Sequence, residues 1–154
     1  MSDQWCTPPL IVERVHRVRP IALDPCGSLD GSVGATRTIL PPDDGLSISW
    51  EGFTFVNPPY SRITPWVAHG LTFVDADVLY LLPESTANWF HLLQRPLGSV
   101  TCFLYQRLAF LRGGVPQANN PKGSMLVLLS RDFGLHDRFR SVFRDLGTIM
   151  VPES

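Results

Sequence analysis

Buried apolar runs alternate along the chain with stretches of helical periodicity, and this alternation restricts the possible folds more than any other feature of the sequence. The expected strands cover residues 21–23, 53–56, 78–82, 100–104, 125–129 and 148–151. The expected helices cover about 8–16, 64–74 and 135–146, and a further helix begins near Ser85 or Thr86 as its cap. This order predicts βαβ units and therefore an α/β fold, with a mostly parallel sheet between flanking helices.

The size and composition of the chain fit a single domain over residues 1–154. With 44% apolar residues the chain can build a substantial core, and little length is left for a second domain. It has no run of eighteen apolar residues and no signal-peptide pattern, so we expect a cytoplasmic protein that has no membrane partner. The spacing of Cys6, Cys26 and Cys102 predicts reduced thiols, and neither the cysteines nor the histidines have a metal-binding spacing.

The net charge of −1 conceals a difference between the two parts of the chain. Residues 1–90 hold five Arg and no Lys against ten acidic residues, whereas residues 91–154 hold seven Arg and one Lys against four acidic residues. The balance is therefore −5 in the first part and +4 in the second. A polyanionic partner for the second part would explain this asymmetry, and so would an ordinary solvated surface.

The sharpest local pattern is Asn57-Pro58-Pro59-Tyr60, which directly follows the expected strand 53–56. Each proline lacks an N–H and disfavours helical geometry in the residue before it, so the loop is stiff and rich in hydrogen-bond acceptors. An amine could donate one hydrogen to the Asn57 side-chain oxygen and the other to the Pro58 carbonyl, while Tyr60 offers a face for stacking. A turn that only ends the strand would use the same residues.

A second polar group, Asp24-Pro25-Cys26-Gly27, follows the expected strand 21–23. In parallel sheets, ligands bind beyond the carboxyl ends of the strands, so this group and the Asn57 loop should lie at one edge. Near the start of the chain, Thr7 followed by Pro8 is a normal helix opening, with Thr7 as the N-cap.

Taken together, these motifs resemble the small phage and prophage DNA adenine methyltransferases, within the class of amino-methyltransferases that carry an Asn/Asp-Pro-Pro-Tyr loop. The similar segments run in order over nearly the whole length. They are Trp5-x-Thr7-Pro8, Leu23-Asp24-Pro25-Cys26, Asp44-Gly45-Leu46 with Trp50, Asn57-Pro58-Pro59-Tyr60-Ser61 with Trp66, Leu81-Leu82-Pro83, Thr86-x-x-Trp89-Phe90-His91, Arg107-Leu108-Ala109-Phe110 and Gly123-Ser124.

The resemblance implies a Rossmann-like class-I methyltransferase domain that uses S-adenosyl-L-methionine to methylate the exocyclic N6 amine of a flipped adenine in double-stranded DNA. A phage-encoded enzyme would work in the host cytoplasm. Its implied catalytic residues are Asn57, Pro58, Pro59 and Tyr60. Its implied cofactor-binding residues are Trp5, Thr7, Pro8, Asp24, Pro25, Cys26, Asp44 and Asn57. DNA contacts are expected from Ser61, Arg62, Arg107, Arg112 and Lys122.

One departure from the family pattern concerns the segment between Asp24 and Asp44. Twenty residues are too few for a full helix, strand and loop, so we expect this part of the fold to be abridged and the ribose-binding carboxylate to be missing. Asp30, Asp43 and Glu51 are alternatives for that role. Cytosine-N4 methylation, a non-catalytic nucleic-acid-binding or cofactor-sensing role, and a monomeric or homodimeric state remain open on the sequence.

Overall fold

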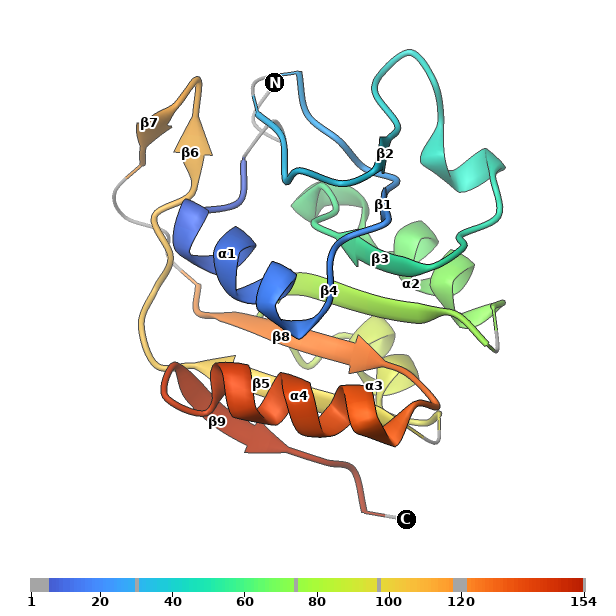
Figure 1. Ribbon diagram of the computed structural model, residues 1–154, viewed down its shortest axis with the longest axis vertical. Coiled ribbons are helices and arrows are strands. Elements are labelled where there is room, and N and C mark those ends of the chain that lie inside the picture. Colours follow the sequence, from blue (N-terminus) through green and yellow to red (C-terminus); the bar gives the residue numbers. More distant parts are fainter. Residues whose placement is uncertain (1–5, 30, 74, 97, 118–121, 154) are drawn as a thin grey trace.

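The computed structural model describes residues 6–29, 31–73, 75–96, 98–117 and 122–153, and in it a seven-stranded sheet lies between two layers of helices (Figure 1). The strand order is β2-β1-β3-β4-β8-β5-β9. The strands of this sheet are β1 (Leu23–Asp24), β2 (Arg37–Thr38), β3 (Phe53–Val56), β4 (Asp77–Pro83), β5 (Ser99–Leu104), β8 (Ser124–Leu129) and β9 (Gly147–Met150). The α-helices are α1 (Pro9–Val18), α2 (Ile63–Leu71), α3 (Asn88–Leu93) and α4 (Phe133–Phe143).

Most strands of the sheet run in the same direction. The pairings β2-β1, β1-β3 and β3-β4 are parallel. Strand β8 is antiparallel to both of its neighbours, β4 and β5, and β9 is antiparallel to β5. Consequently β2, β1, β3, β4 and β5 share one direction, and only β8 and β9 oppose it. The expected α/β class with a mostly parallel sheet is confirmed.

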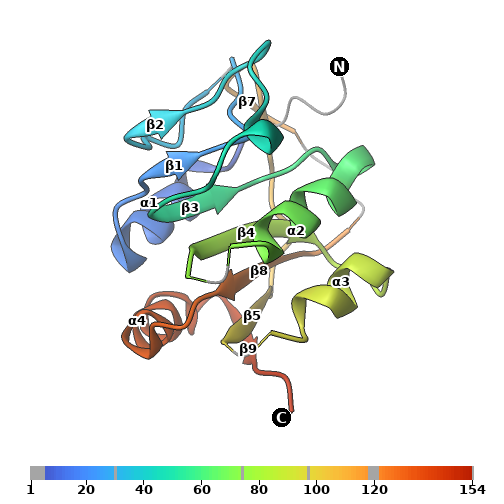
Figure 2. The same cartoon turned by 90° about the vertical axis from the view of Figure 1, so that its right-hand side faces the viewer.

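Each face of the sheet has its own core, because the central strands are buried on both sides. Along β4, Leu79 and Leu81 face the layer of α1 and α4. Tyr80 and the residues two positions before and after it face the layer of α2 and α3. The edge-on view shows the two helical layers on opposite sides of the sheet (Figure 2). Burial on both faces explains why the expected strands appeared as continuous apolar runs.

The first helix is amphipathic, and its opening differs from the expected one. Ile11, Val15 and Val18 are buried on one side of α1, which is the spacing of a helix face. The N-cap is Pro8, whose carbonyl accepts the Ile11 N–H at 3.0 Å, so the assignment of Thr7 as N-cap was wrong. The Thr7 hydroxyl does not cap the helix. It accepts a hydrogen bond from the Asn57 side chain instead.

The third helix also begins later than its sequence signal indicated. Its N-cap is Ala87, which makes no side-chain cap, so neither Ser85 nor Thr86 caps it. Instead the Ser85 hydroxyl accepts the Ala87 N–H at 2.9 Å and forms a local turn in front of the helix. Asp132, in contrast, caps α4 through hydrogen bonds from the Gly134 and Leu135 N–H groups.

Two short features were not expected from the sequence. Strand β2 follows β1 without a helix among the described residues between them, so the connection is abridged as expected, but a two-residue second strand remains. Residues 111–116 form a hairpin from β6 (Leu111–Arg112) and β7 (Val115–Pro116). Among the described residues, no helix is long and apolar enough to cross a membrane.

Candidate active site at the carboxyl edge of the sheet

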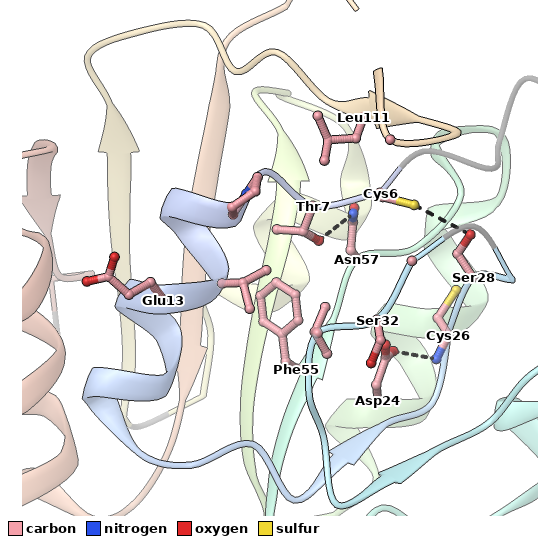
Figure 3. Close-up of a pocket in the computed structure, with 15 residues that line it drawn as sticks. Cys6, Thr7, Glu13, Asp24, Cys26, Ser28, Ser32, Phe55, Asn57 and Leu111 are labelled. Atoms are coloured by element: carbon pink, nitrogen blue, oxygen red, sulfur yellow. Dashed lines mark hydrogen bonds between the residues drawn. The ribbon is translucent and has the colours of Figure 1, made fainter. Parts of the chain in front are cut away.

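The first cavity, of about 350 Å³, lies at the carboxyl ends of β1 and β3. It receives side chains from four separate parts of the chain, as the close-up shows (Figure 3). They are the segment before α1 together with α1 itself, the end of β1 with the loop after it, the end of β3, and the β6-β7 hairpin. The lining residues used below are Cys6, Thr7, Glu13, Asp24, Cys26, Ser28, Val33, Phe55, Asn57, Leu111 and Gly114.

Asn57 connects this cavity to the start of the chain. Its side-chain Nδ2 donates a hydrogen bond to the Thr7 hydroxyl, with 3.0 Å between the two heavy atoms. The bond fixes the orientation of the amide and leaves the Asn57 Oδ1 as the acceptor. Within the described part of the chain, neither this oxygen nor the Pro58 carbonyl accepts a hydrogen bond. The loop thus presents two acceptors that have no partner, as its proline content predicts.

Asp24 is the acidic group at the end of β1, and it is only 5% exposed. Burial raises the pKa of its carboxyl to about 6, although the Cys26 N–H, which donates to it across 3.1 Å, acts in the opposite direction. A carboxylate buried at the cavity wall favours a cationic ligand, because a nearby positive charge would offset the cost of burying the negative one.

The Cys26 sulfur beside the cavity is a protonated thiol rather than a nucleophile. Burial, followed by the charge of Asp24, raises the pKa of Cys26 to about 12. All three cysteines are free, as expected, and the Cys6 thiol donates a weak hydrogen bond to the Ser28 hydroxyl at 3.6 Å. The arrangement therefore suits ligand binding more than thiolate chemistry.

The second cavity, of about 460 Å³, lies beside Tyr60 and is lined by Tyr60, Ile63, Pro83, Ser85, Ala87, Trp89 and Lys122. The Tyr60 ring is 39% exposed and meets the buried Phe110 edge-on, with 6.0 Å between ring centroids. Burial raises the pKa of the Tyr60 phenol to about 12, so the ring is neutral in ordinary conditions. Apolar and aromatic walls with one nearby cation would suit a flat, uncharged ring.

The structure brings together only some of the residues expected to form a cofactor site. Thr7, Asp24, Cys26 and Asn57 line the first cavity. Pro8 and Pro25 adjoin it in sequence but do not line it, and Trp5 lies outside the described residues. Of the alternatives for ribose binding, Asp43 and Glu51 do not line the cavity and Asp30 lies outside the described residues.

Asp44 lies away from both cavities and has a structural partner. Its carboxylate accepts the Leu46 N–H at 2.9 Å and caps the short 3-10 helix η1 (Gly45–Ser47). The buried Gly45 accepts the Trp50 indole N–H at 2.9 Å through its carbonyl and packs directly on the Pro25 carbonyl. The segment after β2 therefore supports the Asp24 loop from behind.

The residues expected to contact DNA lie on several different segments of the chain, and two of them directly follow the Asn57 loop. Ser61 and Arg62 form the 3-10 helix η2 (Tyr60–Arg62) directly after the loop, and Lys122 shares the second cavity with Tyr60. Arg112 lies in β6, next to a residue of the first cavity, and Arg107 precedes it on the exposed stretch that leads to the hairpin.

The hairpin is the part of the site that sequence reasoning missed. The Leu111 and Cys6 backbones exchange two hydrogen bonds, at 2.7 and 3.0 Å, so the hairpin closes one side of the first cavity. Gly113 and Gly114 form its turn with φ values of 58° and 80°. A Gly-Gly pair is a known signal for such a two-residue turn, so this element could have been found.

Comparison with known proteins gave one match. A family model described as DNA N-6-adenine-methyltransferase (Dam) matches residues 1–143. The comparison with curated proteins gave no match, and neither did the comparison with solved structures.

Proposed function

Because the chain belongs to the DNA N-6-adenine-methyltransferase (Dam) family, we propose that it transfers a methyl group from S-adenosyl-L-methionine to the N6 amine of adenine in DNA. The observation that carries this proposal is the position of the Asn57 loop. Asn57 borders the first cavity, and Tyr60, three residues later, borders the second. Two ligands that react with each other must bind in adjacent cavities, as these two are.

The methyl donor fits the first cavity by size and by chemistry. The volume is at the lower end of the range for small-molecule sites, and both polar and apolar groups line it. The Asp24 carboxylate suits the ammonium of the donor's methionine part, while Val33, Phe55 and Leu111 offer apolar contacts. When bound, the donor supplies an electrophilic methyl group. The Glu13 carboxylate turns away from Asp24 and Asn57, so we do not assign it to ribose binding (Figure 3).

The two acceptors of the loop position the target amine. The N6 amine donates one hydrogen to the Asn57 Oδ1 and the other to the Pro58 carbonyl, both of which lack another partner in the described structure. The lone pair of this amine is normally delocalised into the adenine ring. Hydrogen bonds to both hydrogens favour a more pyramidal nitrogen, whose lone pair can point at the methyl group. Catalysis then consists mainly of positioning and electrostatic stabilisation.

The target adenine occupies the second cavity after it has left the duplex. Extruding a base costs a few kcal/mol, and stacking on Tyr60 offsets part of this cost. The remainder would come from phosphate contacts, which we assign to Ser61, Arg62, Arg107, Arg112 and Lys122; Ser61 and Arg62 directly follow the loop, and Lys122 lines the second cavity.

The test is methyl transfer followed by identification of the product. Purified protein is incubated with unmethylated plasmid DNA and S-adenosyl-L-methionine, and the nucleosides are analysed by mass spectrometry. We expect N6-methyladenine, with Asn57→Ala protein as the control. If N4-methylcytosine is found instead, the same loop methylates the N4 amine of cytosine. No product from a folded protein that binds the donor would overturn the proposal.

A further inference from the structure

The two edges of the sheet differ in how well they are protected against pairing with another strand. At one edge, β2 has only two residues and carries the exposed Arg37. Short length and charge are the usual means by which proteins prevent edge-to-edge association. At the other edge, β9 has four residues, and residues 147–151 contain no charged side chain. Strand β9, the other edge of the sheet (Figure 1), is therefore longer than β2 and carries no charge.

The hydrogen-bond alternation in the β5-β9 pair shows which backbone groups of β9 are open. The Tyr105 N–H donates to the Leu146 carbonyl at 2.9 Å, which identifies this opposed pair as a hydrogen-bonded one. Such pairs alternate along antiparallel strands, so Thr148 and Met150 bond to β5. Gly147, Ile149 and Val151 therefore direct their N–H and C=O groups toward the open side.

Pro152 does not block that edge. Strand β9 ends at Met150, but if its alternation is continued by two residues, the missing N–H of Pro152 falls on the β5 side, as do the N–H groups of Thr148 and Met150. The proline ends the pairing with β5 without removing a donor from the open side.

Apolar and charged side chains beside this strand lack partners in the described structure. Met150 is 57% exposed, Val151 53% and Phe133 61%, and the last two line a hollow of about 410 Å³ next to the end of β9. The same hollow is lined by Arg95, Arg140, Asp137 and Glu153, none of which forms an ion pair or a side-chain hydrogen bond within the described residues. The arginines Arg14, Arg17 and Arg19 on or directly after α1, by comparison, all have acidic partners.

We propose that β9 is the interface of a symmetric dimer, in which it pairs antiparallel with β9 of a second copy of this chain. A surface with unpaired charges of both signs is complementary to itself, since a two-fold axis can bring the cations of one copy near the anions of the other. With the axis at Ile149, Ile149 pairs with itself and Gly147 with Val151, which gives about six main-chain hydrogen bonds. This proposal does not depend on the proposed enzymatic activity, because β9 ends at the opposite end of the sheet from Asn57.

The test compares two valines of similar exposure. Val151 lies at the proposed interface, whereas Val115, which is 59% exposed, lies on the hairpin. In sedimentation velocity over a concentration series, we expect the wild-type protein to reach twice the mass of one chain. Val151→Lys should weaken the dimer at least tenfold, and Val115→Lys should leave the dissociation constant unchanged. A monomer at every concentration, or equal effects of both substitutions, would overturn the proposal.

Amide hydrogen exchange tests the strand pairing directly. In the dimer, the Ile149 and Val151 amides should exchange more slowly as the protein concentration rises, and Val151→Lys should restore fast exchange at position 149. A dimer in which the Ile149 amide exchanges as fast as in the monomer would use another face, and that result would also exclude the β9 interface.

Discussion

The two cavities on either side of the Asn57 loop are lined by different kinds of side chain. The first is bordered by the buried carboxyl of Asp24 and by the bond between Asn57 and Thr7, and its walls come from segments far apart in the sequence. The second is bordered by the rings of Tyr60 and Trp89 and by Lys122. In the function we propose, the fixed polar groups of the first cavity bind the charged methyl donor, and the rings of the second cavity stack on the target base.

The largest effect should follow from Asn57→Ala, which removes an acceptor and keeps both prolines. We expect single-turnover methyl transfer to fall by about 10²–10³-fold, as when one pre-positioned hydrogen-bond partner of a transition state is lost. Donor binding, measured by isothermal titration, should change little. Asn57→Asp is the matched control and should retain more activity, because a carboxylate also accepts from an amine. A folded Asn57→Ala protein that transfers methyl at the wild-type rate would show that the loop only ends β3.

Tyr60→Ala should separate the second cavity from the first. Loss of a stacking face should weaken capture of the target base by about 1–3 kcal/mol. Donor affinity should stay as in the wild type, because Tyr60 does not line the first cavity. Tyr60→Phe keeps the face and should be tolerated. The measurement is the DNA concentration dependence of single-turnover transfer, and equal losses with Ala and Phe would instead assign the role to the phenol oxygen.

If Asp24 binds the methyl donor as proposed, donor affinity should depend on pH. Since its pKa is about 6, the carboxylate that attracts a cation is mostly protonated at pH 5, and donor affinity should be about tenfold lower there than at pH 7. Asp24→Asn should bind weakly at both pH values. A wild-type affinity that is constant between pH 5 and pH 7 would remove Asp24 from the donor site.

The Asp24 carboxyl should also affect folding stability. A rise in pH should favour donor binding but lower the stability of the empty protein. The folded pKa is above the ordinary value of 3.8, so the empty protein loses stability as pH rises from about 4 to about 6 and regains none above that. Asp24→Asn should therefore stabilise the empty protein at neutral pH, by as much as about 3 kcal/mol. Thermal unfolding of both proteins between pH 4 and pH 8 measures this difference, which should vanish at the acidic end.

The smallest effect should come from Thr7→Val, which removes the hydroxyl that accepts from Asn57 and keeps the shape of the side chain. One hydrogen bond contributes about 1 kcal/mol, so turnover should fall by roughly fivefold through looser orientation of the amide. Thr7→Ser restores the hydroxyl and should restore the rate. If valine and serine behave alike, the contact between Thr7 and Asn57 does not position the loop.

The sequence indicated the long elements well and the short ones poorly. The strands around Phe55, Tyr80 and Val127 were predictable because burial on both faces produces an uninterrupted apolar run. Strand β2 was not predictable, since two residues carry no periodicity and form a strand only by pairing with β1. Sequence patterns therefore predicted the strands that are buried along their whole length, but not a strand that forms only by pairing with a neighbour.

The candidate site shows the same division. The end of each parallel strand is visible in sequence, so Asp24 and Asn57 could be expected at one edge, and they line one cavity. Leu111 could not be assigned to that cavity, because its pairing with Cys6 joins segments more than a hundred residues apart. Asp44, which the resemblance assigned to the cofactor, instead caps the 3-10 helix η1 and lines neither cavity.

The packing of Gly45 on the Pro25 carbonyl affects how a mutational scan of this protein should be interpreted. Any larger side chain at position 45 would collide with that carbonyl and displace the loop that carries Asp24, since Gly45 and Pro25 are both buried. A screen for lost methylation would therefore score Gly45 as essential although it touches neither cavity. A map of functional residues drawn from such data alone would wrongly include Gly45 in the active site. Its role is to avoid a steric clash with the Pro25 carbonyl.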